Sequence, residues 1–249
     1  MNLIKAIRLE GRAVTANRFA MFILFLQPVL IMACLRIAGD SNFIPPGSIE
    51  PIRSFDYFAP AVLAISLIYI CAQTTMLRIV GERKAEGGTL DRERLGIDNF
   101  SHFFGKFIAN SFFALLQCTL LLLVGLILGL EIKGSVGIFF ILLFLAALFG
   151  LALGLIVSVF AKTKLQAAYI IPLIVIILMI FGDVIIPVSA MPENIRSIAE
   201  HLPITVVYNG LTTIQNNSST EVNSKMIIIF IWTIILLLIG IIKYSIEKG

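Results

Sequence analysis

Long runs of apolar residues, separated by short polar segments, dominate the chain. The runs cover approximately residues 19–38, 57–80, 107–130, 135–160, 165–187 and 225–243. About 20 apolar residues in a helix span roughly 30 Å of bilayer hydrocarbon, so each run is long enough for a transmembrane helix. A membrane β-barrel would show short segments of alternating polarity, whereas residues 115–130 are apolar on every face. The pattern therefore predicts an all-α integral membrane protein with six transmembrane helices.

Composition agrees with this prediction. Hydrophobic residues make up 59% of the chain, charged residues 14%, and the mean hydropathy is +1.00. In a water-soluble domain about a quarter of the residues are charged. With no internal repeat visible, residues 1–249 are read as a single transmembrane domain. Its three cysteines, Cys34, Cys71 and Cys118, fall inside predicted spans, where a thiol behaves as a small apolar group, and they indicate neither disulfides nor a metal site.

The positions of Lys and Arg predict the orientation, because short loops rich in these residues stay in the cytoplasm. Fourteen of the 19 lie on one side of the predicted bundle: Lys5, Arg8, Arg12, Arg18, Arg78, Arg83, Lys84, Arg92, Arg94, Lys106, Lys162, Lys164, Lys243 and Lys248. Both termini are therefore expected in the cytoplasm of a multi-pass protein of the plasma or inner membrane. This retention accounts for the net charge of +4 without a nucleic-acid partner.

The first 18 residues form a candidate interfacial helix. Lys5, Arg8 and Arg12 share one helical face, while Ile4 and Ile7 lie on another. Such a helix suits the inner membrane surface. It serves either as a basic topology anchor or as a contact for a cytoplasmic partner.

A dense charged segment, residues 81–106, separates the second and third runs. It mixes acidic and basic side chains, and Leu90, Leu95 and Ile97 form an apolar strip beside the charges. A short amphipathic helix near Gly87 and Gly88 would suit docking to a partner. The alternative is a solvated loop that only connects the two spans.

The segment 188–223 lies on the predicted outer side before the last run. Ile195, Ile198, Ala199 and Leu202 follow helical spacing between Pro192 and Pro203, and a second set, Ile204, Val207, Tyr208 and Leu211, follows the same spacing beyond Pro203. Two short amphipathic helices are expected, which either enter the outer leaflet or cap the spans.

Several polar residues fall within the apolar runs, where they are costly in lipid and tend to face protein or a cavity. Ser66 and Gln73 share a face of the second span, as do Asn110 and Gln117 in the third. Either pair can line a translocation path or form hydrogen bonds between helices. The spacings Gly125-x-x-x-Gly129 and Gly150-x-x-x-Gly154 predict close helix packing. Asp183 is either a gating or cation-binding group or an interfacial carboxylate.

Catalytic and cofactor motifs are not found in the sequence. The Gly-rich letters near Lys84 stand in the wrong order for a phosphate-binding loop, so ATP is not expected to bind this chain. His102 and His201 lie on opposite predicted sides of the membrane, and neither belongs to a zinc-protease motif or sits near a second ligand type at metal spacing. We therefore predict no catalytic residues, no cofactor and no metal on this chain.

Motifs in chain order resemble those of the ATP-binding-cassette (ABC) type-2 permeases over roughly residues 75–215. In the charged segment these are Glu82, Arg83, Glu86, Gly88, Thr89, Leu90 and Asp91, followed by Gly105 and Lys106. Further on are the letters LLQCTLLLLVG, the small-residue span and polar turn LGLIVSVFAKTKLQAA, the outer IPVSAMP and the stretch HLPITVVYNGL. The pattern departs from the family in lacking a Thr-Pro pair after Asp91.

The resemblance implies a permease subunit of an ABC exporter, with a re-entrant helical pair before the last span. A separate ATPase would bind and hydrolyse ATP, and the seven residues Glu82 to Asp91 named above would couple to it. A second permease copy or a homologue would complete the path. The alternatives are a membrane-anchored assembly or scaffold protein and an intramembrane enzyme, neither of which performs ATP-driven transport.

Overall fold

Helices account for most of the chain. The computed structural model describes Ile4, Ile7 and residues 18–38, 42–44, 51–84, 99–161, 163–216 and 222–246. Its helices are α2 (Arg18–Ala38), α3 (Ser54–Lys84), α5 (Asn99–Ile127), α6 (Val136–Phe160), α7 (Lys164–Phe181), α8 (Glu193–Ala199), α9 (Pro203–Gln215) and α10 (Val222–Ile246), with a 3-10 helix, η1 (Val188–Ala190), before α8. The predicted helical class is confirmed.

One small element departs from the all-α prediction. The strands β1 (Asn42–Phe43) and β2 (Ile52–Arg53) pair antiparallel between α2 and α3, with Asn42 opposite Arg53. Two residues are too few to produce an alternating hydrophobic pattern, so no sequence pattern indicated this pair.

Four helices in the described part of the chain are long and apolar enough to cross a membrane. They are Ser54–Gly81, Phe104–Ile127, Val136–Phe160 and Val222–Lys243, and they match the second, third, fourth and sixth predicted spans. The shorter apolar stretches Phe25–Ala38 and Ala168–Phe181 lie where the first and fifth spans are expected. Those two spans remain predictions.

Two predicted span ends are wrong, and a turn ends the helix early in both places. α5 ends at Ile127 rather than at residue 130, because Gly129 has a φ of +88° and the Leu130 amide donates to the Gly125 carbonyl, as in a Schellman motif. α7 ends at Phe181 rather than at residue 187, because the chain turns at Gly182 and Asp183, where φ is +63°. Gly129 is therefore a turn residue and not the close-packing site predicted from its spacing.

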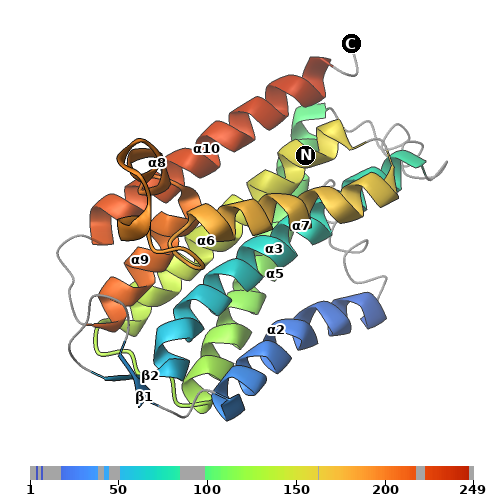
Figure 1. The fold of residues 1–249 in the computed structure, drawn as a ribbon. Helices are drawn as coiled ribbons and strands as arrows, with labels where there is room; N and C mark the ends of the chain where they lie inside the picture. Colours follow the sequence, from blue (N-terminus) through green and yellow to red (C-terminus); the bar gives the residue numbers. More distant parts are fainter. Residues whose placement is uncertain are drawn as a thin grey trace.

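The long helices alternate in direction along the chain, so their ends gather at two ends of one bundle (Figure 1). The C-terminal ends of α3 and α10 and the N-terminal ends of α5 and α7 lie together at one end. α6 occupies the centre and packs against α3, α5, α7, α9 and α10. It is the most apolar helix, and its buried residues extend from Phe139 to Val159.

Two glycines bring α6 against α3. A Cβ atom on Gly150 would lie 2.6 Å from the Ile68 carbonyl oxygen, and one on Gly154 would lie 2.3 Å from that of Ala72. Neither distance leaves room for a side chain, so the two backbones touch directly. This confirms Gly150-x-x-x-Gly154 as a close-packing site. By contrast, a Cβ on Gly125 would meet only side-chain atoms, the nearest on Leu130 at 3.3 Å.

Large apolar side chains cover the outside of the bundle. Those on α5, α7 and α10 with more than half of their surface accessible include Phe112, Leu123, Ile127, Leu165, Tyr169, Leu173, Ile227, Leu238 and Ile242. A water-soluble monomer does not present so continuous an apolar surface. The bundle is therefore built to be surrounded by lipid or by other apolar helices.

Two predicted segments fall outside the described residues. Of the N-terminal interfacial helix only Ile4, Ile7 and Arg18 are described; all three are helical, and Arg18 begins α2. Of the predicted coupling residues, Glu86, Gly88, Thr89, Leu90 and Asp91 lie outside.

Candidate functional site

The end of α3 carries the first two predicted coupling residues. Glu82 and Arg83 lie in the last turn of α3, which is one continuous helix of 31 residues from Ser54 to Lys84. At 1.5 Å per residue this helix is about 46 Å long, which exceeds the roughly 30 Å of bilayer hydrocarbon. The backbone at Glu82 and Arg83 can therefore extend beyond the lipid while remaining part of the same rigid element as the buried residues.

Near this end, a polar contact joins α3 to α5. Arg78 of α3 donates a hydrogen bond to the side-chain oxygen of Asn110, and the Asn110 amide donates to the Lys106 carbonyl at 2.7 Å. Asn110 is buried, with 6% of its surface exposed, and Lys106 has 3% exposed. Asn110 thus serves in this structure as an interhelical hydrogen-bonding residue, one of the two roles predicted for it.

The other candidate path residues are also buried. Gln73 donates a long hydrogen bond, 3.5 Å, to the Ala168 carbonyl of α7. Ser66 and Gln117 are buried on α3 and α5. The contacts therefore place Gln73 at the boundary of α3 with α7 and Asn110 at the boundary of α3 with α5, and no contact joins the four into one cluster.

Some of these polar groups have no hydrogen-bond partner. Among the described residues, the buried atoms without one are the Gln73 Oε1, Gln117 Nε2, Thr75 Oγ1 and Thr205 Oγ1 atoms. Because a buried polar atom without a partner is costly, each is a place where water or a polar solute would be stabilised. Gln73 and Gln117 therefore each have one buried side-chain atom that could hydrogen-bond to water or to a polar solute, in addition to any structural role.

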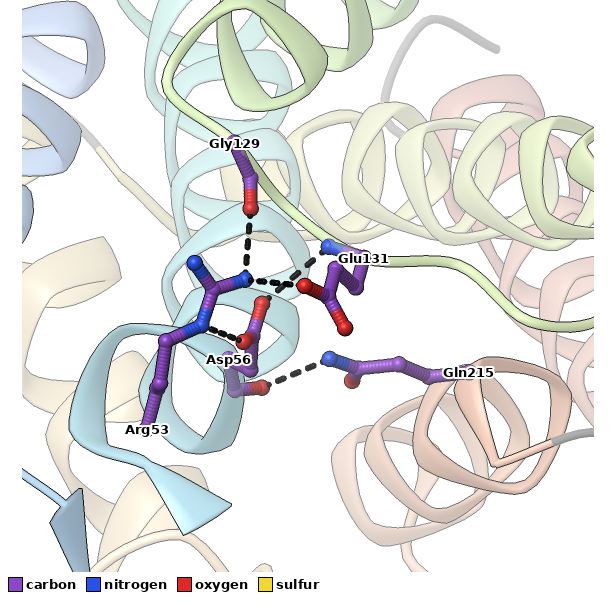
Figure 2. A network of polar contacts seen from close by, with 5 residues as sticks. All are labelled: Arg53, Asp56, Gly129, Glu131 and Gln215. Carbon is purple, nitrogen blue, oxygen red and sulfur yellow. Dashed lines mark hydrogen bonds and ion pairs between the residues drawn. The ribbon is translucent and has the colours of Figure 1, made fainter.

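A second polar network lies at the opposite end of the bundle (Figure 2). Arg53 donates from Nε to the Asp56 carboxylate at 2.7 Å and from Nη2 to the Gly129 carbonyl at 2.9 Å, and its Nη2 also lies 3.1 Å from the Glu131 carboxylate. Asp56 in turn accepts from the Glu131 backbone amide at 3.1 Å. The Gln215 side chain donates to the Asp56 backbone carbonyl at 2.9 Å.

The network joins three segments that are distant in sequence: the start of α3, the connection between α5 and α6, and the end of α9. The Lys133 amide strengthens the link by donating to the Gln215 carbonyl at 3.0 Å. Gly134 allows the close approach, since a Cβ there would lie 2.3 Å from the Ile214 carbonyl oxygen. Sequence reasoning missed this cluster, although an acidic residue one turn after Arg53, at the edge of an apolar run, was an available signal.

Replacing Asp56 with alanine is expected to destabilise the protein by about 2 kcal/mol. Asp56 is 7% exposed, and its removal would leave the Glu131 amide without its acceptor and Arg53 without its shortest contact. Thermal unfolding of the detergent-purified chain measures the effect as a lower midpoint.

Glu131 provides the matched comparison. Its side chain is 65% exposed, so its ion pair with Arg53 is screened by solvent, and Glu131→Ala is expected to cost at most about 1 kcal/mol. An equal loss of stability in the two variants would contradict the central position that the structure gives to Asp56.

Asp183 acts as a turn residue. Its backbone has a φ of +63°, and its carboxylate accepts a hydrogen bond from the Val188 amide at 2.7 Å. This contact closes the turn between α7 and η1. This structural contact explains the aspartate at position 183 without the gating or cation-binding role considered from the sequence.

The two short helices predicted before the last span are present. α8 begins directly after Pro192, and α9 begins at Pro203, where proline is favoured because the first helical residue needs no amide donor. α9 is mostly buried and packs on α6 and α10, whereas α8 is mostly exposed. Lys225 of α10 donates to the Asn209 carbonyl and the Thr213 hydroxyl, which fixes α9 alongside α10.

Comparison with known proteins identifies the class of the chain. Residues 40–242, which are most of the chain, match the sequence pattern of the family described as ABC-2 family transporter protein. The chain therefore belongs to the ABC-2 transporter family, and its bundle of apolar helices is a multi-pass membrane domain. No curated protein matches it closely enough to add a more specific relative.

Proposed function

We propose that this chain is the permease subunit of an ABC exporter in the plasma or inner membrane, with six transmembrane helices and both termini in the cytoplasm. The observation that carries the proposal is the family match over residues 40–242. Membership implies an ABC ATPase as partner, because the family supplies the membrane part of transporters that ATP hydrolysis drives.

The arrangement of the helices supports the proposed orientation. The bundle end that gathers the C-terminal end of α3 and the N-terminal ends of α5 and α7 also carries the basic residues Arg78, Lys106 and Lys164. By the positive-inside rule this end faces the cytoplasm. The end of α3, with Glu82 and Arg83, and the segment that follows it, with Glu86, Gly88, Thr89, Leu90 and Asp91, then face a cytosolic ATPase.

The length and packing of α3 support a coupling mechanism. Movement of the ATPase would act on the end of α3 at Glu82 and Arg83. α3 is a single helix fixed to α6 along the contact at Gly150 and Gly154, so a displacement at its end is transmitted to the bundle centre rather than absorbed in a loop. Ser66, Gln73, Asn110 and Gln117 are proposed to line the translocation path that this movement opens.

Co-purification tests the proposal. The tagged chain is expressed with the ATPase subunit from the neighbouring gene, extracted in mild detergent and captured, and ATP hydrolysis by the eluate is measured. The ATPase is expected to co-elute and to hydrolyse ATP in the complex. A folded chain that captures no ATPase, while a family member of known composition does so under the same conditions, would contradict the proposal.

A further inference from the structure

The depth of the α8–α9 turn follows from its contacts with α10. Lys225 and Lys243 bracket 17 uncharged residues on α10. At 1.5 Å per residue these span about 26 Å, close to the thickness of bilayer hydrocarbon. The two lysines therefore mark the levels at which α10 enters and leaves the lipid. The Lys243 ammonium lies 5.3 Å from the centroid of the Phe160 ring at the end of α6.

Trp232 sets the depth of the turn between α8 and α9, because it lies within the stretch of α10 between Lys225 and Lys243. Its indole Nε1 donates to the His201 carbonyl at 3.0 Å. Trp232 follows Lys225 by seven residues, which places it about 10 Å deeper along the helix. Since Lys225 contacts Asn209 and Thr213 near the far end of α9, the two helices run antiparallel and the order of depths is fixed. The turn between α8 and α9 thus lies well within the hydrocarbon thickness.

α7 reaches a similar depth from the other side. A Cβ on Gly182 would lie 2.0 Å from a methyl carbon of Ile204, so the end of α7 packs directly on the start of α9. Both ends of the connection between α7 and α9 therefore lie at a similar level. α8 lies in the connection between these two points.

The side chains of α8 do not suit lipid on all sides. Glu193, Arg196 and Glu200 fall at spacings that place them on one face of the helix, and all three are exposed. Ile195 and Ile198 lie on the other face, with 41% and 66% of their surfaces accessible. The apolar face suits hydrocarbon. Glu200 is directly beside His201 in the turn, and its side chain is too short to reach the membrane surface from this depth.

A charged side chain within the hydrocarbon thickness normally faces a water-filled cavity or a charged partner. Arg196 uses its guanidinium to donate to the carbonyls of Ser189 at 2.7 Å and Met191 at 3.3 Å, both in its own connection. Glu193 and Glu200 are both exposed in the described part of the chain, and the main packing contact of α8 is with η1.

We infer that the charged face of α8 lines a water-filled vestibule that enters the outer half of the membrane and admits polar or charged solutes as far as Glu200. The inference rests on the proposed function only for the side of the membrane on which the vestibule opens. It adds the charged face of α8 to the residues that are proposed to line the path. The sequence did not indicate this face, since neither Glu193 nor Glu200 lies in an apolar run.

Thiol labelling tests the vestibule. In a Cys34→Ala background, which removes the exposed native cysteine, single variants Glu200→Cys, Ile198→Cys and Ile231→Cys are made in the full chain. A charged, membrane-impermeant methanethiosulfonate is added to the outside of intact cells. Ile198→Cys reports the other face of α8, and Ile231→Cys reports the lipid-facing surface of α10 at the level of Trp232.

Glu200→Cys is expected to react at least about tenfold faster than the two isoleucine variants, because water favours the reactive thiolate and lipid suppresses it. If Glu200→Cys does not accumulate as folded protein, Glu193→Cys takes its place. Equally fast reaction of Glu200→Cys and Ile198→Cys, with Ile231→Cys slow, would place α8 outside the bilayer and overturn the inference. Failure of Glu200→Cys to react from either side of the membrane would also overturn it, because lipid or a second copy would then cover this face.

Repeating the labelling on inside-out vesicles distinguishes a failure of this inference from a failure of the proposed orientation. Fast reaction of Glu200→Cys only in these vesicles would support a hydrated α8 face and would contradict the orientation assigned under the proposed function.

Discussion

Gly154→Val is expected to cost the folded protein about 3 kcal/mol and to lower its unfolding midpoint by about 6–12 °C. The reason is geometric: the new Cβ would lie 2.3 Å from the Ala72 carbonyl oxygen and 2.9 Å from the Ala72 Cα. Both atoms belong to the α3 backbone, so no side chain can rotate to relieve the overlap. α6 must move away from α3, and the buried contacts along their boundary are lost. The midpoint is measured on detergent-purified protein.

Gly137→Ala is the matched control on the same helix. A Cβ at Gly137, in the first turn of α6, would meet only the Ser135 hydroxyl oxygen at 3.7 Å. Alanine also favours a helix over glycine, so the midpoint is expected to stay the same or to rise slightly. A similar fall in both variants would show that α6 tolerates no change at any glycine, and would contradict a specific α3–α6 contact.

Reversing Glu82 and Glu86 to lysine, together with Gly88→Val, is expected to weaken ATPase capture by about tenfold or more. In the proposed complex the two glutamates meet complementary charges on the ATPase, and reversal converts attraction into repulsion. The β-branched side chain at Gly88 additionally disfavours the backbone turn proposed there. The measurement is the amount of ATPase that co-elutes with a fixed amount of permease.

Glu193→Lys controls for the change in charge. Glu193 is exposed on α8, on the opposite side of the membrane in the proposed orientation, so capture of the ATPase should be unchanged. If the triple variant captures as much ATPase as the unmodified chain, Glu82, Glu86 and Gly88 do not form the coupling contact, whatever the role of the remaining residues in that segment.

Local signals in the sequence were enough to predict most of the helices. Apolar runs located the four long spans, and the prolines at 192 and 203 located the starts of α8 and α9. These signals work because they depend on residues within one or two turns of each other. The close contact at Gly150 and Gly154 was also predicted, because small residues four apart on an apolar helix leave a groove for a neighbour.

Helix ends and side-chain partners were harder to predict because they depend on segments that are distant in the chain. α7 ends where Gly182 meets Ile204, a contact with a different helix. Asn110 was predicted as a polar residue facing protein, but its partner Arg78 was read only as a basic residue that sets orientation. Gln215 lies 159 residues from Asp56, and no local pattern connects them.

The proposed coupling mechanism depends most directly on the side of the membrane to which the segment between α3 and α5 is exposed. A Thr89→Cys variant in the Cys34→Ala background can be treated with a charged, impermeant thiol reagent in intact cells and in inside-out vesicles. Reaction is expected in the vesicles and protection in intact cells, because in the proposed mechanism Thr89 must meet a cytosolic ATPase. Reaction in intact cells would place the segment outside, beyond the reach of ATP-driven coupling, and would contradict the proposed mechanism.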